Sequence, residues 1–159
     1  MSVQVDIQTA SAEPVPDEDD IRNWIATALV GLAPQEEIEI SVRLVDSEEM
    51  TTLNETFRGK IGPTNVLSFP SDLPDELQLP LLGDIVICVP IVRAEAAQQG
   101  KSLTAHWAHM VIHGTLHLLG YDHIAQDEAV TMETLESAIL ARLDYPCPYR
   151  GSLPREHSA

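Results

Sequence analysis

The sequence predicts an α+β fold, in which helices pack on a small mixed β-sheet of about four strands. Two observations predict it. Four short segments have the apolar patterning of strands, and helical segments between and after them give the order β-α-β-α-β-β-α-α-α. No internal repeat or glycine-rich nucleotide-binding loop interrupts this order. With 159 residues the chain fits one domain, which we expect to span residues 1–150, with residues 151–159 as a disordered tail.

The first strand and the first helix are predicted near the N-terminus. Apolar and polar residues alternate over residues 3–7, which is the period of a half-buried strand. Asp17 is placed to cap a helix that runs to about Val30, with acidic residues in its first turn and Gly31 after its end. The apolar residues of this segment form one stripe, so the helix should face the core.

Three more strands complete the predicted sheet. Residues 38–44 alternate in the same way, and Asp46 and Glu49 then fit a capping box at the start of a second helix. The third strand is predicted over residues 65–69. Residues 82–89 are almost continuously apolar, which predicts a strand buried on both faces.

Three helices are predicted in the C-terminal half. Pro90 suits the first turn of a helix that continues to Gly100. Ser102 or Thr104 should cap the next helix, which is apolar enough to be buried. The last helix is predicted over residues 124–143.

Three histidines on the second of these helices and beyond it have the spacing of a metal site. His113 and His117 stand four residues apart, so on a helix they are separated by about 40° in angle and about 6 Å along the axis. Gly120 can end the helix, because glycine takes the left-handed backbone conformation at little cost. The chain can then turn back and bring His123 to the same ion. We therefore predict a metal site on this helix and the turn after it.

Three imidazole ligands leave a tetrahedral zinc ion one open position, where the pKa of a bound water falls to about 7. Such a site is catalytic rather than structural. We expect zinc, one ion per chain, although imidazole also suits copper, nickel and iron. The alternative is a cluster of hydrogen-bonded histidines without metal, which explains a single buried histidine well and three at this spacing poorly.

The spacing H-x-x-x-H-x-x-G-x-x-H is also that of metzincin proteases, which carry a glutamate directly after the first histidine as general base. Here that position is Gly114, which cannot accept a proton. A metallopeptidase-like hydrolase is therefore an alternative that lacks its usual base.

The composition restricts the partners of the chain. A net charge of −16 with nine basic residues argues against a broad electrostatic grip on nucleic acid, so such a substrate would be held locally or delivered by a partner. Cys88 and Cys147 form no C-x-x-C pattern, and the N-terminus lacks the basic and apolar regions of an export signal. We expect a cytoplasmic protein without a membrane partner.

Three blocks of the sequence resemble the YbeY family of bacterial rRNA-maturation endoribonucleases. They follow one another in the family's order and comprise residues 57–70, 82–87 and 113–123. The resemblance implies a single-domain metal-dependent hydrolase, usually with zinc, that cuts single-stranded RNA, matures the 3′ end of the small-subunit rRNA and helps to dispose of defective ribosomes. The implied partners are single-stranded RNA, rRNA, and the ribosome or its small subunit with associated factors. No DNA substrate is expected.

The resemblance assigns the metal ligands to His113, His117 and His123, and a functionally important arginine to Arg58. We expect Arg58 to neutralise charge on phosphoryl oxygens, because its planar guanidinium can meet two of them at once. The competing interpretation is a solvated loop cation.

Several roles stay open. His106, His109 and Asp122 could support the ligands or simply lie at the surface, and the general base is unassigned. A further alternative to the nuclease is a non-catalytic ribosome assembly factor with a structural metal, whose removal should unfold the domain.

Overall fold

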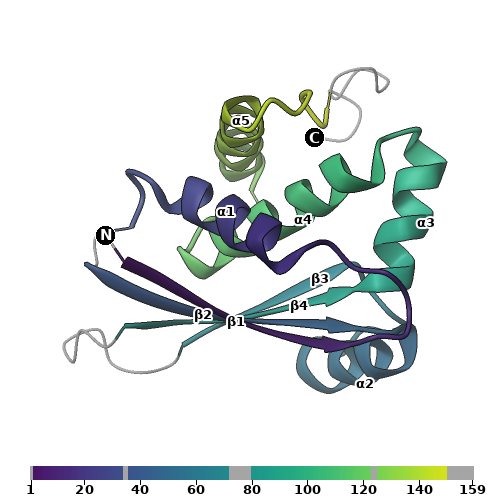
Figure 1. Ribbon diagram of the computed structural model, residues 1–159. Helices are drawn as coiled ribbons and strands as arrows, with labels where there is room; N and C mark the ends of the chain where they lie inside the picture. Colours follow the sequence, from purple (N-terminus) through teal and green to yellow (C-terminus); the bar gives the residue numbers. More distant parts are fainter. Residues whose placement is uncertain (1, 34–35, 72–79, 123–124, 150–159) are drawn as a thin grey trace.

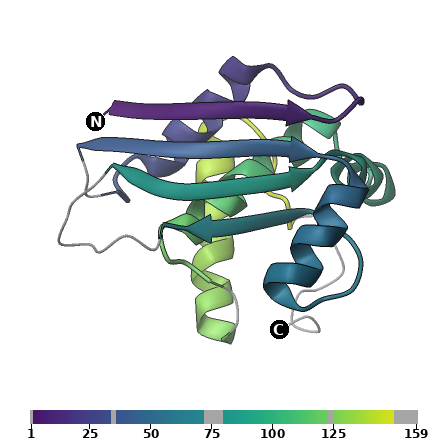
Figure 2. The ribbon, with the colours of Figure 1, turned by 90° about the horizontal axis from the view of Figure 1, so that it is seen from below.

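The computed structural model describes residues 2–33, 36–71, 80–122 and 125–149, in which a four-stranded sheet carries helices on both faces (Figure 1). The strand order is β1-β2-β4-β3; the first three are parallel and β3 pairs antiparallel with β4 at the edge (Figure 2). The strands are β1 (Ser2–Ala10), β2 (Glu37–Val45), β3 (Val66–Pro70) and β4 (Leu81–Cys88). The predicted α+β class and mixed sheet are confirmed.

The helices follow the predicted order, with the boundaries shifted by a few residues at most. They are α1 (Glu18–Leu29), α2 (Ser47–Arg58), α3 (Val89–Gln99), α4 (Leu103–Leu118) and α5 (Gln126–Arg142). Helices α1, α4 and α5 lie on one side of the sheet and α2 on the other (Figure 1). The start predicted for the last helix, Ile124, lies outside the described residues, as does the tail predicted for residues 151–159.

The predicted caps have different outcomes. The Asp17 carboxylate accepts a hydrogen bond from the Asp19 amide and caps α1 as predicted. The capping box at α2 is wrong: Asp46 stands at the N-cap position, but its side chain makes no capping hydrogen bond. It accepts one from the Ser11 hydroxyl instead, and Glu49 pairs with Arg43 at 2.6 Å. The two carboxylates thus bind a hydroxyl and a guanidinium from other segments instead of the backbone amides at the start of α2.

The main core lies between the sheet and α1, α4 and α5, and a smaller apolar cluster lies between the sheet and α2. Helix α4 contacts β3, β4 and the helices α1, α3 and α5, so it is buried on most of its circumference. This explains why its sequence is apolar nearly throughout rather than striped. No helix in the described ranges has the length and apolar character needed to cross a membrane.

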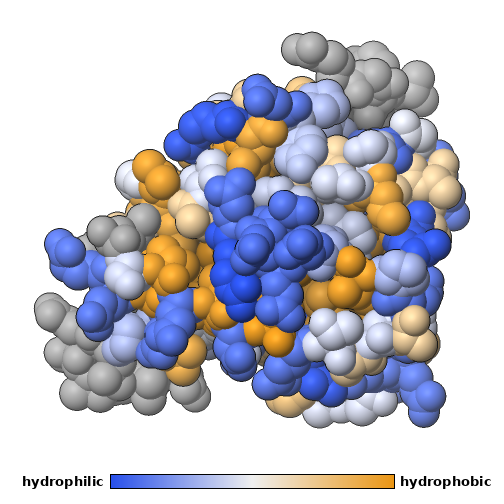
Figure 3. Space-filling view, in the orientation of Figure 1, coloured by the Kyte–Doolittle hydropathy of each residue, from blue (hydrophilic) through white to orange (hydrophobic). Residues whose placement is uncertain are grey.

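One hydrophilic part of the surface lies over the first helix of the chain. Hydrophilic side chains gather over α1 (Figure 3), whose first turn contains Glu18, Asp19 and Asp20. The two cysteines are free thiols.

Candidate active site

Helix α4 positions the predicted metal ligands. Ser102 caps its start by accepting a hydrogen bond from the Ala105 amide at 3.0 Å. At its end, the amides of Gly120 and Tyr121 donate to the carbonyls of His117 and Leu116 at 3.0 and 3.1 Å. This is the pattern of a Schellman motif, and it requires the positive φ of 101° that Gly120 adopts. The turn predicted after the helix is therefore present.

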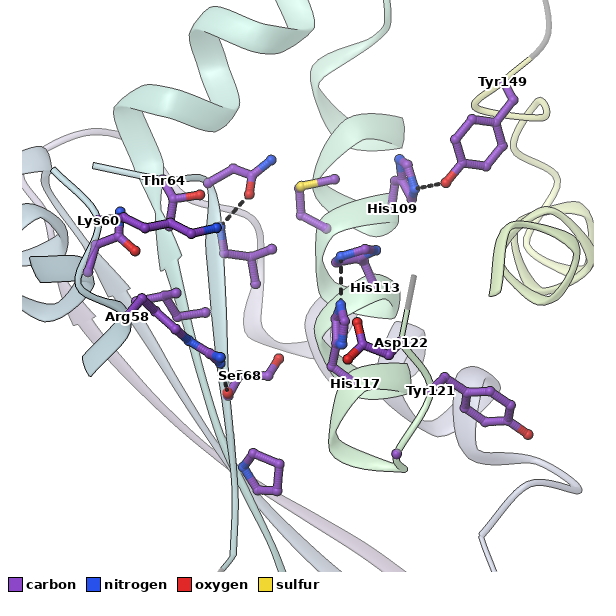
Figure 4. A pocket seen from close by; sticks show the side chains of 17 residues that line it. Arg58, Lys60, Thr64, Ser68, His109, His113, His117, Tyr121, Asp122 and Tyr149 are labelled. Atoms are coloured by element: carbon purple, nitrogen blue, oxygen red, sulfur yellow. Dashed lines mark hydrogen bonds between the residues drawn. The ribbon is translucent and has the colours of Figure 1, made fainter. Parts of the chain in front are cut away.

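His113 and His117 turn their Nε2 atoms toward each other at a distance of 3.1 Å (Figure 4). Two nitrogens bound to one tetrahedral zinc ion at about 2.0–2.1 Å would lie about 3.3 Å apart. The observed spacing therefore fits ligation of one ion by both rings. Both rings are half-buried and border a cleft, where an ion would still be accessible.

Glu136 of α5 lies behind these histidines and was missed in the sequence analysis. Its carboxylate accepts hydrogen bonds from His113 Nδ1 at 2.5 Å, from His109 Nε2 at 3.1 Å and from the Tyr149 hydroxyl. Burial would raise the pKa of Glu136, but the hydrogen bonds from His109 and His113 outweigh it and hold the pKa well below its usual range. A sequence signal existed, because Glu136 falls on the apolar stripe of α5 with Met132, Ile139 and Leu140.

His109, His113 and Glu136 also form a group of side chains that could hold a metal, with ligand atoms within 4.8 Å of one another. In the structure these atoms are joined by hydrogen bonds and the Glu136 side chain is 1% exposed. His113 thus has one nitrogen in this buried network and one at the cleft. Only the cleft nitrogen leaves room for a substrate beside an ion.

The cleft has a volume of about 750 Å³ and lies between two walls that different segments of the chain form. One wall is α4 with the turn after it, and the other is formed by the end of α2, the following loop and β3 (Figure 4). Arg58 and Lys60 line the second wall, across from the histidines. The Arg58 guanidinium donates to the Ser68 carbonyl at 3.0 Å, and the Asn54 amide holds the loop through the Gly62 carbonyl at 2.8 Å.

The cleft is locally basic although the chain is acidic. Arg22, Arg43 and Arg93 each pair with a carboxylate. No such ion pair to Arg58 or Lys60 occurs in the described part of the chain, where Asp122 is the one carboxylate that lines the cleft. Two cations are therefore available to an anionic ligand.

Gly114 lies where α4 approaches the sheet most closely. A Cβ atom added there would come within 2.8 Å of the Ile85 Cγ2 atom and 3.3 Å of the Ser68 Oγ atom. The glutamate that metzincin proteases carry at this place would fit only after a shift of α4 or of the side chains it packs against. The peptidase alternative therefore lacks both the base and the space for it.

The other residues that the sequence singled out as possible parts of the site lie in different places. His109 lines the cleft and bonds to Glu136, so it supports the site from behind. His106 lies in the first turn of α4, where it bonds to Glu95 at 2.9 Å and does not line the cleft. Asp122 lines the cleft, whereas His123 lies outside the described residues and its ligation stays a prediction.

The fold and site together define a class: a small α+β protein with a histidine pair and two cations on opposite walls of one cleft. The sequence model of the endoribonuclease YbeY family matches residues 4–144, and the chain belongs to this family. It is accordingly an endoribonuclease, a hydrolase that acts on RNA.

Curated relatives agree with this assignment over most of their length. The chain is 55% identical to the endoribonuclease YbeY of Cellvibrio japonicus over 147 residues, which cover 92% of this chain and 82% of that protein. It is 54% identical to the endoribonuclease YbeY of Pseudomonas syringae pv. tomato over 156 residues, covering 98% and 93% of the two chains. The solution structure of TM1509 from Thermotoga maritima has the same fold, with a TM-score of 0.53 and 23% identity over 95% of this chain and 98% of that chain.

Proposed function

We propose that the protein is a single-strand-specific, metal-dependent endoribonuclease that matures rRNA, above all the 3′ end of the small-subunit rRNA, and acts in ribosome quality control. The observation that supports this most is the 3.1 Å pairing of the His113 and His117 Nε2 atoms on one wall of a cleft whose other wall presents Arg58 and Lys60. A metal and a phosphate can be held in the same space by these two walls. Family membership favours this function over the peptidase and the non-catalytic assembly factor.

We assign the metal ligands to His113, His117 and His123, and zinc to the ion. The imidazoles of the first two fit the tetrahedral spacing, and Tyr121 and Asp122, which directly precede His123, line the cleft. When bound, zinc supplies a Lewis acid that lowers the pKa of water. The described part of the site offers no cysteine, which supports zinc in a catalytic rather than a structural role.

Arg58 carries the electrostatic part of the reaction in this proposal. Its Nη2 atom is held by the Ser68 carbonyl, which fixes the guanidinium against the cleft wall and leaves other donors for phosphoryl oxygens. Lys60 adds a second cation from the loop. Charge that develops on the phosphoryl group is thus met by donors that are already in place.

Preference for single strands is supported by apolar residues beside the cations. Phe57 and Ile61 are 62% and 95% exposed, and each adjoins a cation of the cleft in sequence. The Phe57 ring is fixed edge-on against Phe69, with centroids 5.4 Å apart. Unpaired bases can contact such apolar groups, whereas the bases of a duplex are stacked on one another.

The acidic surface supports delivery of RNA by a partner. With a net charge of −16, phosphate binding is confined to the cleft, so an rRNA end would be presented within the ribosome or its small subunit. The proposed function places the protein in the cytoplasm with the ribosomes.

The test is cleavage of a single-stranded RNA and of its duplex by the wild type and by H113A, with bound metal measured in both. We expect about one metal per wild-type chain and cleavage of the single strand only, and a folded variant that has lost metal and activity. Equal cleavage by both preparations would contradict the proposal, as would cleavage of duplex at the same rate.

A further inference from the structure

The Glu136 carboxylate is a buried anion that is satisfied entirely by side-chain donors. Both oxygens are engaged: Oε2 by His113 Nδ1 at 2.5 Å, and Oε1 by His109 Nε2 at 3.1 Å and by the Tyr149 hydroxyl. An ionised carboxylate only accepts hydrogen bonds, so the nitrogens that contact it must carry their protons. The arrangement therefore determines the tautomers of two histidines on α4.

For His113 the consequence lies at the cleft. A neutral imidazole has one protonated nitrogen, and with the proton on Nδ1 the Nε2 atom keeps its lone pair. It is this Nε2 atom that faces His117 Nε2 at 3.1 Å. The opposite tautomer would place a proton where a metal ion has to bind.

We propose that Glu136 is a positioning residue of the metal site, which holds His113 in the ligating tautomer, and that Tyr149 and His109 in turn hold Glu136. This inference rests on the proposed function, since it assumes an ion at His113 and His117. It ties the site to the C-terminal segment, because Tyr149 follows the end of α5 and reaches back to both α5 and α4. His109 contributes at a cost, since its Nδ1 atom is buried without a hydrogen-bond partner.

The test measures metal affinity by competition with a chelator, together with the visible absorption of bound Co²⁺. E136Q replaces one acceptor oxygen by an amide donor, so it cannot satisfy all three donors, and we expect Zn²⁺ affinity to fall about 10- to 100-fold with an altered Co²⁺ spectrum. E136D keeps the carboxylate and should restore part of the affinity. E48Q makes the same change of charge at an exposed position of α2 and should behave as wild type.

Y149F removes a single hydroxyl and tests whether the hydrogen bond from Tyr149 to Glu136 supports metal binding. We expect weaker Zn²⁺ binding than wild type, by less than about tenfold, with the fold intact. Y145F is its control, since Tyr145 packs against the main core rather than bonding to Glu136. If E136Q does not fold, Y149F decides, and unchanged affinity in Y149F overturns the proposal.

The outcomes separate this inference from the proposed function. A wild type that binds no metal contradicts both. A wild type that binds Zn²⁺, next to a folded E136Q with the same affinity and the same Co²⁺ spectrum, contradicts the inference alone.

Discussion

The Ser68 hydroxyl donates a hydrogen bond to the carbonyl of Gly114 at 2.9 Å and so joins the edge strand β3 to the middle of helix α4. The same strand residue holds Arg58 through its own carbonyl. The cation wall and the histidine wall of the cleft are thus fixed relative to each other at Ser68. This close contact depends on the absence of a side chain at position 114.

Replacing Gly114 by alanine should destabilise the protein. The added Cβ would meet the Ile85 Cγ2 atom at 2.8 Å in a fully packed core, which costs about 1–3 kcal/mol, while the better helix propensity of alanine returns up to about 1 kcal/mol. Urea unfolding of G114A should show a lower midpoint. As a control, G114A should cost less when added to I85A than when added to the wild type, because the opposing methyl group is gone. An equal cost in both backgrounds would contradict the steric explanation.

His117→Ala distinguishes the two places where His113 could bind a metal. An ion at the cleft uses His117, so H117A should lose about one bound Zn²⁺ per chain and its cleavage activity while staying folded. An ion within the group of His109, His113 and Glu136 would be retained. H106Q is the matched control, since His106 lies on the same helix but does not line the cleft. The metal content of each variant, measured after dialysis, decides between the cleft site and the buried site.

Most of the fold could be predicted because its signals are local. Strand alternation, the Asp17 cap, Pro90 in the first turn of α3 and the turn at Gly120 each depend on a few neighbouring residues. The α2 capping box failed for the opposite reason. Ser11, which lies 35 residues before Asp46, binds the Asp46 carboxylate, and Arg43 of the preceding strand binds Glu49, so tertiary contacts replace the local capping pattern.

The site was predictable only in part for the same physical reason. His113 and His117 share one helix, so their spacing alone predicts their proximity. Glu136 and Tyr149 reach the same place from other segments, and only the packing of α5 against α4 brings them there. A charged residue on the apolar stripe of α5 was the available signal for Glu136.

His106 should make stability depend on pH. Burial lowers its pKa, only partly offset by the hydrogen bond to Glu95, and His109 and Lys101 lower it further. The folded state therefore binds fewer protons than the unfolded state as the pH falls through the unfolded pKa of about 6.5, so this contribution to stability is lost on acidification and present above that pH. H106Q should lose less stability than wild type between about pH 7.5 and about pH 5.5 in urea unfolding. Parallel curves would contradict this assignment.

Phe57→Ala should weaken the binding of single-stranded RNA. The ring is 62% exposed, and in the proposed function it contacts an unpaired base; contacts between bases and aromatic rings contribute about 1–3 kcal/mol per base. We expect a higher KM with little change in kcat, because Phe57 adjoins Arg58 in sequence but does not line the cleft that holds the reacting groups. V130A is the control, since Val130 is 59% exposed on α5. An unchanged KM in F57A would exclude the ring from the binding site.

Arg58→Glu should abolish cleavage without removing the metal. The guanidinium lines the cleft opposite the histidines, and loss of one such donor to a developing oxyanion typically lowers kcat by about 10² to 10³, to which the reversed charge adds repulsion of the phosphate. R58K keeps the charge but not the planar fork, and it should retain part of the activity. R142E makes the same charge reversal at the exposed end of α5 and should cleave as wild type does. If R58E and R142E cleave equally, Arg58 is a solvated cation and the charge on the phosphoryl group must be met by Lys60 or by the metal.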